Sequence, residues 1–259
     1  MSHPMNRREV LTMGGCATAA VLASGPTVPA AADTPKSADS SGQPATARPF
    51  TFSLNTGTIR GQKLPLPEQF EVAAQAGYDG IEPWTRDVQQ YVESGGSLDE
   101  LRKRRSDLGL EVISAIGFAD WVGDDDARRK AGLEQMKREM DWVRQIGGTR
   151  IAAPPAGIYR VKGADLCVVG QRYRHLLEIG RQRGVVPQLE IWGTAGTLNR
   201  LSEAVFVAIE AAHPDACLLL DAYHLFRGGS DLESLRLISG AAMHAFHIND
   251  YPAEPPREE

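Results

Sequence analysis

Five polar side chains lie at or just beyond the ends of short apolar runs, where they could take part in chemistry. Glu82, Glu190, Asp221 and His247 each end such a run, and His224 follows Asp221 by three positions. In a parallel barrel these ends lie together, and inward-pointing carboxylates and an imidazole are costly to bury without a partner. A divalent cation is the usual way to satisfy such a set. For each residue alone, the alternative is a carboxylate paired with arginine, or a histidine bonded to a carbonyl.

The elements that must position these side chains alternate along the chain from Phe50 onward. A short apolar or β-branched run, a polar loop and an amphipathic helix recur, which predicts a parallel sheet covered by helices. Glycines such as Gly184 and Gly240 follow expected helix ends, where a left-handed residue is favoured. The expected strands are 52–55, 80–83, 112–117, 150–153, 186–191, 217–221 and 243–249. The expected helices are 67–76, 98–108, 127–145, 165–182, 198–212 and 231–239.

This alternation favours an α/β barrel as the fold class. The repeated units carry no GxGxxG turn, so a (β/α)8 TIM barrel is favoured over a dinucleotide-binding fold. After the seventh expected strand the chain runs through Pro252, Pro255 and Pro256 with neither a helix nor a strand. We therefore expect a barrel that is truncated after its seventh strand. Such a fragment is expected to be poorly soluble and essentially inactive by itself.

Length and composition limit the class of protein. The 259 residues, with 42% hydrophobic and 24% charged content, suit a globular protein of one large domain or two small ones. The net charge of -5 offers no basic surface for a phosphate backbone, so no nucleic-acid partner is expected. The three cysteines form no CxxC pair, which argues against a disulfide framework and a thiolate zinc site.

The first 49 residues are expected to lie outside the barrel, which would occupy residues 50–259. Arg7 and Arg8 precede a short apolar run, and this pattern predicts a twin-arginine signal peptide over residues 1–32. The run is too short to span a membrane, so no permanent membrane anchor is expected. Residues 33–49 are rich in Ser, Ala, Pro and Thr and predict a disordered spacer. The mature chain is therefore expected to be periplasmic or extracytoplasmic.

Several motifs resemble those of a known group of barrel enzymes. The motifs are Leu189-Glu190-Ile191-Trp192, Leu220-Asp221-Ala222-Tyr223-His224 and His247-Ile248-Asn249-Asp250. The segments Ser53-Leu54-Asn55-Thr56 and Tyr78-Asp79-Gly80-Ile81-Glu82 also resemble that group. It is the sugar phosphate isomerase/epimerase group of the xylose isomerase-like TIM barrel superfamily. Within it, the chain is most similar to inosose isomerase-like proteins.

The resemblance implies a role for each candidate residue. The implied metal ligands are Glu190, Asp221 and His247. The implied substrate-binding residues are Glu82, His224, Trp84 and Trp192, with the two tryptophans as apolar walls. Glu190 and His224 are the implied catalytic residues. Ordinary packing at a loop is the alternative for both tryptophans.

The chemistry implied is proton transfer beside a carbonyl of a keto sugar or inosose, through an enediolate. An oxygen-rich site with one imidazole suits a divalent metal of the Mn²⁺, Mg²⁺ or Co²⁺ type. Ketose 3-epimerases of the superfamily carry a second glutamate shortly after the one on the fifth strand. This chain has Gly193-Thr194-Ala195-Gly196 there, which argues against ketose 3-epimerisation.

Other classes of function stay open beside the isomerase. One is a sugar-binding or catalytically degenerate barrel, because a fold does not determine its function. Another is an endonuclease-type metallohydrolase, which would need more histidines at a multi-metal site and a basic surface. His175, His213 and His244 are expected to lie away from the site. The expected partner is a small-molecule sugar, and a homo-oligomer is left open.

Overall fold

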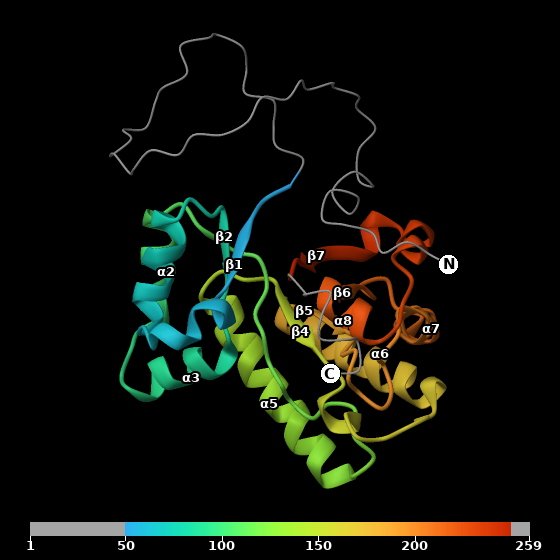
Figure 1. Cartoon of the computed structure of the whole chain (residues 1–259). Helices are drawn as coiled ribbons and strands as arrows, with labels where there is room; N and C mark the ends of the chain where they lie inside the picture. Colours follow the sequence, from blue (N-terminus) through green and yellow to red (C-terminus); the bar gives the residue numbers. More distant parts are fainter. Residues whose placement is uncertain (1–49, 250–259) are drawn as a thin grey trace, which may run out of the picture. The chain divides into compact units, whose positions relative to one another are not determined.

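The computed structural model describes residues 50–249 of the chain (Figure 1). Residues 1–49 and 250–259 lie outside the described part. The expected signal peptide at 1–32 and the expected spacer at 33–49 therefore lie outside it as well. All the described residues belong to one unit, which spans Arg48–Glu259.

Within residues 50–249 parallel strands occur at each of the seven places where the sequence predicts one. The first three pair in the order β1-β2-β3 and the last four in the order β4-β5-β6-β7. The backbone N–H of Ala152 donates to the carbonyl of Ala115 at 2.8 Å and joins the two sheets. The strands are β1 (Ser53–Asn55), β2 (Gly80–Glu82), β3 (Glu111–Val112), β4 (Arg150–Ala153), β5 (Val186–Glu190), β6 (Leu218–Asp221) and β7 (Met243–His247).

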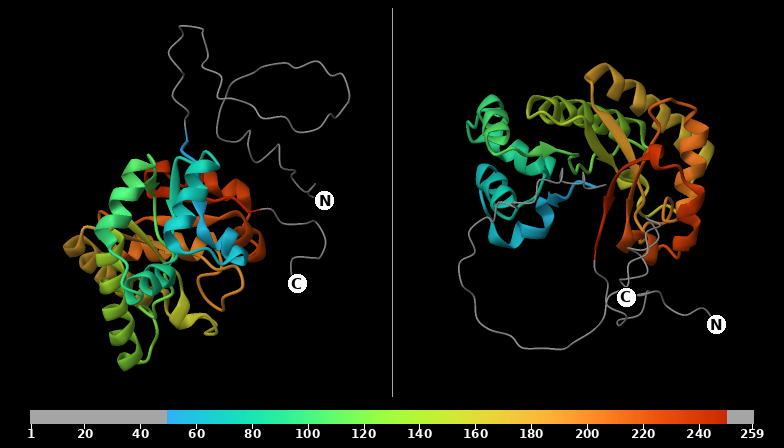
Figure 2. Two further views of the ribbon diagram at one scale, coloured as in Figure 1. Left: turned by 90° about the vertical axis from the view of Figure 1, so that its left-hand side faces the viewer. Right: turned by 90° about the horizontal axis from the view of Figure 1, so that it is seen from above.

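Helices follow the strands along the chain and cover the outer side of the sheets (Figure 2). Strands inside and helices outside, in sequential order, is the arrangement of a β/α barrel. The described α-helices are α2 (Leu66–Gln75), α3 (Thr85–Glu93), α4 (Leu98–Asp107), α5 (Asp126–Gln145), α6 (Leu166–Arg183), α7 (Leu201–Ala211) and α8 (Ala222–Arg227). The described 3-10 helices are η1 (Thr56–Gln62), η2 (Ala156–Ile158), η3 (Leu232–Leu237) and η4 (Gly240–Ala242).

One predicted helix is wrong. The segment 231–239 forms the 3-10 helix η3 over Leu232–Leu237 instead of an α-helix. Leu232, Leu235 and Ile238 pack against the core, but they are only partly buried. Gly240 does not adopt the expected left-handed conformation and begins η4 instead. At Gly184 the expectation is confirmed, since it ends α6 with a φ of 71°.

Two further segments differ in extent from what the sequence predicts. The expected strand 112–117 pairs with β2 only over Glu111–Val112, and Ile116 then forms an isolated bridge with Trp84. The sequence analysis does not include α3. Val88, Tyr91 and Val92 nevertheless recur at helical spacing and pack on one apolar cluster, so the signal for this helix was present in the sequence.

The main apolar core fills the space between the sheet of β4 to β7 and helices α5 to α7. Its fully buried residues include Met140, Tyr173 and Leu189. The Tyr173 hydroxyl lies 2.9 Å from the carbonyl oxygens of both Pro187 and Cys217. It thereby ties α6 to β5 and to the residue that precedes β6. A buried hydroxyl that is bonded in this way satisfies the polar groups inside the core.

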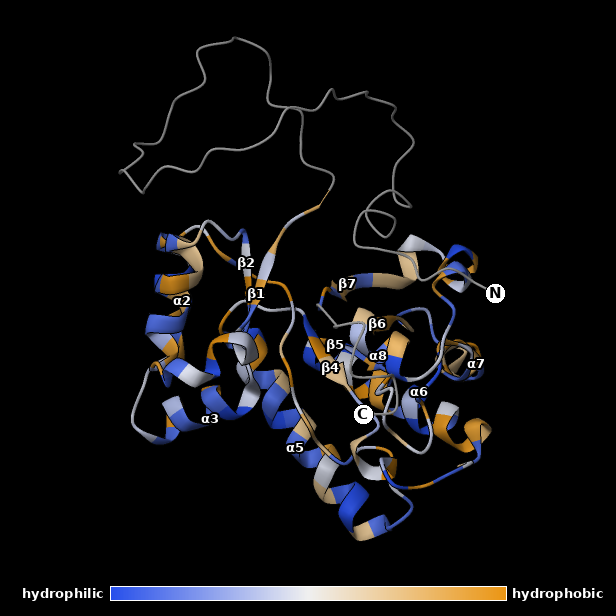
Figure 3. Ribbon diagram, in the orientation of Figure 1, coloured by the Kyte–Doolittle hydropathy of each residue, from blue (hydrophilic) through white to orange (hydrophobic). Residues whose placement is uncertain are grey.

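The inner faces of the strands are filled by side chains as well. Ile116, Ala152 and Leu219 form an apolar cluster there, and Gln188 donates to Ser114 at 3.0 Å where both are fully buried. Two of the outer helices are more polar, and Figure 3 shows α3 and α5 built mainly from hydrophilic residues. No helix in the described part of the chain has the length and apolar character that crossing a membrane requires.

Candidate active site

The four predicted strand-end residues lie at the same end of the barrel. Glu82 is the last residue of β2, Glu190 of β5, Asp221 of β6 and His247 of β7. Because the strands are parallel, their carboxyl ends meet, and catalytic groups of barrel enzymes come from such ends. The three carboxylate residues are only 4–6% exposed. The structure therefore brings together residues that are far apart in the sequence.

The imidazole of His247 lies between two of these carboxylates. Its Nε2 is 2.8 Å from Oε2 of Glu82, and its Nδ1 is 3.4 Å from Oδ2 of Asp221. Burial by itself would lower the pKa of His247, but the charges and hydrogen bonds of Glu82 and Asp221 raise it to about 11. The ring therefore carries a positive charge at neutral pH. Against the effect of burial, the hydrogen bond from His247 lowers the pKa of Asp221.

The pKa of Glu190 is shifted in the opposite direction from that of Asp221. Its Oε2 is buried and has no hydrogen-bond partner among the described residues. Burial raises the pKa of the Glu190 carboxyl to about 8, and the charges of Asp221 and Glu82 add to this shift against the opposing charge of His247. A carboxyl whose pKa is close to neutral can both give and take a proton. Glu190 is thus suited to acid–base chemistry.

His224 lies beside this cluster in α8, which begins directly after β6. The side chain of Asp221 caps α8 by accepting from the backbone N–H of His224 at 3.1 Å. The backbone N–H of Gly193, in the loop after β5, donates to Nδ1 of His224 at 3.3 Å. A ring nitrogen that accepts a hydrogen bond carries no proton, so the proton lies on Nε2. Burial lowers the pKa of His224, and the neutral ring offers Nε2–H as a donor.

Two asparagines complete the cluster, and the sequence analysis does not identify a role for either. The amide of Asn55 donates to Oε2 of Glu82 at 2.8 Å, and the amide of Asn249 donates to Oδ2 of Asp221 at 2.7 Å. Asn55 is the last residue of β1, so the rule that sites gather at strand ends could have found it. Asn249 lies two residues after His247, within one of the motifs that carry the family resemblance.

The donor chemistry of the cluster fits a divalent cation. Carboxylate oxygens and an imidazole nitrogen are ligands for Mn²⁺, Mg²⁺ and Zn²⁺. Oε1 of Glu82 and Oε2 of Glu190 are buried without a hydrogen-bond partner among the described residues, so both could face a cation. Within residues 50–249, no three His, Cys, Asp or Glu side chains are arranged to hold a metal ion. His247 directs both ring nitrogens to carboxylates, and its positive charge takes the place that a cation would fill.

The two tryptophans that the resemblance implies as walls both lie beside the cluster. Nε1 of Trp84 donates to Oδ1 of Asn55 at 3.0 Å. Trp192 follows Glu190 by two residues, and its side chain acts against burial to lower the pKa of Glu190. Phe118 lies between them, with its ring centroid 5.1 Å from that of Trp84 and 5.8 Å from that of Trp192. Trp84 therefore reaches the acidic cluster through its polar edge, by way of Asn55.

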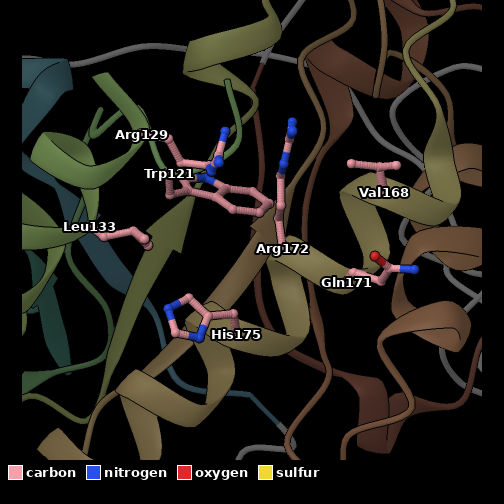
Figure 4. Close-up of a pocket in the computed structure, with 7 residues that line it drawn as sticks. All are labelled: Trp121, Arg129, Leu133, Val168, Gln171, Arg172 and His175. Carbon is pink, nitrogen blue, oxygen red and sulfur yellow. The ribbon is translucent and has the colours of Figure 1, made fainter. Parts of the chain in front are cut away.

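A cavity of about 190 Å³ lies away from this cluster, between α5 and α6 (Figure 4). Trp121, Arg129 and Arg172 are among the residues that line it. The guanidinium of Arg129 donates to the carbonyl of Gly123 at 2.7 Å, and that of Arg172 donates to the carbonyl of Val122 at 2.7 Å. Both arginines therefore hold the loop before α5 in place. The cavity contains none of the predicted site residues.

The other histidines of the described part lie outside the cluster, as the sequence predicts. His175 lines the cavity in Figure 4. His213 is buried, and its Nδ1 accepts from the backbone N–H of Asp215 at 3.1 Å. His244 is exposed on β7, on the face opposite to that of His247.

The chain is similar to known proteins over most of its length. A family model described as a xylose isomerase-like TIM barrel matches residues 70–258. That range contains all five polar residues that the sequence singles out at strand ends. Among solved structures, the IOLI protein with a zinc atom has a TM-score of 0.70 at 21% identity, over 78% of this chain and 75% of that chain. The likeness shows the same fold, so the predicted TIM barrel is confirmed.

Curated relatives cover much of this chain at low identity. A 3-dehydroshikimate dehydratase of Pseudomonas aeruginosa is 26% identical over 77% of this chain, but the match spans only 30% of that relative's length. A 3-dehydro-D-guloside 4-epimerase of Escherichia coli is 27% identical over 61% of this chain and 64% of the relative. An inosose isomerase of Bacillus velezensis is 23% identical over 71% of this chain and 67% of the relative.

Proposed function

This chain belongs to the xylose isomerase-like TIM barrel family, and from that membership we propose that it is a divalent-metal-dependent isomerase or epimerase of a keto sugar or inosose. It is related to an epimerase, an isomerase and a dehydratase, all of which are enzymes. The reaction, the substrate and the dependence on a metal are parts of the proposal. The support for each comes from the cluster at the strand ends.

One observation carries the proposal. Glu82, Glu190, Asp221 and His247 come from four different strands and converge at the end of the barrel where catalytic groups gather. Burying so many ionisable groups together destabilises a fold, and such clusters are therefore typical of binding or catalytic sites. The unpartnered oxygens of Glu82 and Glu190 support a cation as the missing partner.

Glu190, Asp221 and His247 are the residues that would hold the metal. A bound divalent cation would polarise the carbonyl of the substrate and make the neighbouring C–H more acidic. His247 must give up one ring proton to act as a ligand, so metal binding is expected to release a proton. Asn249 donates to Asp221 and orients its carboxylate for this task.

We assign the proton transfer to Glu190 and a hydrogen bond to the substrate to His224. Glu190 takes the proton from the carbon beside the carbonyl onto the carboxylate oxygen that does not face the metal, and it returns the proton to a different carbon or face. His224 donates Nε2–H to a substrate oxygen and holds the substrate in place. Trp84 and Trp192 exclude water from one side of the cluster, which strengthens these polar interactions.

A dehydratase is the second candidate, and the similarity to a 3-dehydroshikimate dehydratase favours it. Removal of water from a hydroxy ketone begins with the same proton abstraction beside a carbonyl, so Glu190 would have the same role. The two reactions differ in the next step, where a hydroxyl leaves and no proton returns. A sugar-binding barrel without turnover is the remaining alternative.

Exchange of a carbon-bound proton for deuterium tests the proposal. The full chain is incubated in D₂O with Mn²⁺ and a panel of keto sugars and inososes, and ¹H NMR follows the proton beside the carbonyl. We expect exchange with at least one substrate, and a rate at least about a hundredfold lower for Glu190→Gln. Glu178→Gln, a change on the outer helix α6, should leave the rate unaltered.

The outcomes separate the candidates. Exchange with a new isomer or epimer supports the proposed function, and exchange with an unsaturated product supports the dehydratase. No exchange with any member of the panel favours the sugar-binding alternative. Equal rates for wild type and Glu190→Gln would contradict the role of Glu190.

We also propose that the protein acts outside the cytoplasm. The twin-arginine pattern at Arg7 and Arg8, followed by a short apolar run, supports export of the folded chain. A folded, metal-loaded barrel is a suitable cargo for that route. This proposal is independent of the chemistry at the strand ends.

A further inference from the structure

Gly193, in the loop that links β5 to α7, lies directly against α8. Its backbone N–H donates to Nδ1 of His224 at 3.3 Å. The backbone N–H of His224 in turn donates to the side chain of Asp221 at 3.1 Å. His224 is therefore tied to the loop after β5 by its ring and to the end of β6 by its backbone.

The hydrogen bond from Gly193 requires a residue without a side chain. A Cβ atom at this position would lie 2.4 Å from the carbonyl oxygen of His224, 2.6 Å from Cβ of Arg227 and 2.6 Å from the backbone nitrogen of Gly228. Ordinary van der Waals contact lies between 3.4 and 4 Å. Two of the three atoms belong to the backbone, so they cannot rotate away as the end of a long side chain could. Only glycine lets the loop approach α8 this closely.

Gly228 makes a second close approach between the same loop and α8. A Cβ atom at Gly228 would lie 1.7 Å from the carbonyl oxygen of Asn199, which belongs to the loop that also contains Gly193. The backbone N–H of Gly228 donates to the carbonyl of His224 at 2.9 Å where α8 ends. The two glycines therefore let α8 pack on the loop through backbone contacts, and this packing fixes the distance between Gly193 and His224.

The hydrogen bond between Gly193 and His224 tolerates little movement. At 3.3 Å the distance between its two nitrogen atoms is already at the long end of the range for such bonds. A side chain at position 193 would push the loop away from α8, and the bond would be broken. The neutral ring of His224 would then be free to carry its proton on either nitrogen.

We propose that Gly193 is a positioning residue, which keeps His224 in the tautomer that carries its proton on Nε2. The consequence for the reaction rests on the proposed function, in which His224 contacts the substrate. With the proton on Nε2 the ring can only donate there, so it selects a substrate oxygen that accepts, such as a carbonyl oxygen or an enediolate oxygen. The other tautomer would present an acceptor at Nε2 and would not stabilise negative charge on that oxygen.

Nitrogen NMR of the full chain labelled with ¹⁵N-histidine tests the proposal without any need for turnover. The chemical shift of each ring nitrogen shows whether it carries a proton, and the signals of His224 are those that His224→Asn lacks. At about pH 8 the ring is neutral, because burial lowers the pKa of His224. We expect the Nε2–H tautomer in wild type, and a ratio of Nε2–H to Nδ1–H at least about fivefold lower in Gly193→Ala. A wild-type ring that carries its proton on Nδ1 would overturn the inference, whether or not Gly193→Ala folds.

Gly196→Ala is the matched control. Gly196 lies in the same loop, but a Cβ atom there would meet the carbonyl oxygen of Val161 at 2.5 Å and not α8. We expect this variant to keep the wild-type tautomer of His224. An unchanged ratio of tautomers in a folded Gly193→Ala, or the same change in Gly196→Ala, would overturn the inference. A change confined to Gly193→Ala, in a protein that shows no deuterium exchange, would contradict the proposed reaction but leave the positioning role standing.

Discussion

At the scale of single residues, the protonation of His247 decides how the cluster is charged. The ring bridges Glu82 and Asp221, and with a pKa of about 11 it remains protonated over the physiological range. Its charge offsets one carboxylate and leaves the cluster negative overall. A divalent cation adds more positive charge than the imidazolium and can therefore displace its proton.

The first prediction concerns the metal ligands. Asp221→Ala and His247→Ala should abolish stoichiometric binding of Mn²⁺, because each removes a ligand from a site with few of them. His224→Ala should keep the metal and lose turnover, since its Nε2–H serves the substrate. Metal analysis after equilibrium dialysis measures the first effect. His244→Ala is the matched control on the opposite face of β7, and equal metal content in all these variants would contradict the site.

A second prediction concerns Glu139, a buried carboxyl in α5 that the proposed mechanism does not use. The residue is 4% exposed, its Oε1 accepts from Gln135 at 2.9 Å, and its Oε2 lacks a hydrogen-bond partner among the described residues. Burial raises the pKa of Glu139 above its ordinary value. The folded state therefore holds a proton that the unfolded chain releases once the pH rises above about 4.3.

The sign of the pH dependence follows from this difference. The contribution of Glu139 to the free energy of unfolding is most favourable below the pKa that this residue has in the unfolded chain. It is lost as the pH rises through the higher pKa of Glu139 in the folded protein. Glu139→Gln does not titrate, so it should be more stable than wild type at neutral pH by roughly 1 to 3 kcal/mol. Urea denaturation at a series of pH values measures the difference. A difference that stays constant from pH 5 to pH 8 would show that Glu139 does not ionise as described.

At the scale of elements, Asp221 has two roles at the junction between β6 and α8. Asp221 ends the strand and caps the helix, so its Oδ1 is used by the backbone N–H of His224 while its Oδ2 faces Asn249 and His247. The cap holds His224 one turn from the carboxylate. The relative position of the implied metal ligand and the implied substrate donor is therefore set by local structure.

The third prediction concerns the contact between α6 and the sheet. Tyr173→Phe removes the buried hydroxyl that lies 2.9 Å from the carbonyls of Pro187 and Cys217. The polar groups around it lose a partner that water cannot replace, so the free energy of unfolding should fall by about 1 to 3 kcal/mol. The midpoint of urea denaturation measures the loss. Tyr78→Phe, at a residue that is 37% exposed, should change the midpoint little, and an equal effect of both would contradict the argument.

At the scale of the whole molecule, the fourth prediction concerns export. Replacing Arg7 and Arg8 together by lysine should leave the precursor in the cytoplasm, because the twin-arginine route requires the arginine pair. Cell fractionation and the size of the product measure the outcome. A matched variant with Arg102→Lys and Arg104→Lys, in α4, should be exported normally. Export of the Arg7 and Arg8 variant at the normal rate would show that another signal is used.

Much of the fold is determined by local sequence. The alternation of apolar runs and amphipathic helices predicts all seven described strands, and residues such as Glu190 and Asp221 can be read as strand ends from the runs that precede them. The prediction fails at α3, which the sequence analysis omits, and at η3, where the apolar residues are only partly buried. The sequence therefore indicates which residue types form the site and at which end of the barrel they lie.

Only the tertiary structure decides how these residues act on one another. Glu82 and His247 are 165 positions apart, and their 2.8 Å contact exists because parallel strands bring distant segments side by side. The roles of Asn55 and Phe118 arise in the same way, through neighbours contributed by other loops. The raised pKa of Glu190 depends on how much water the surrounding barrel excludes. Desolvation and charge coupling act through space, so no pattern along the chain contains them.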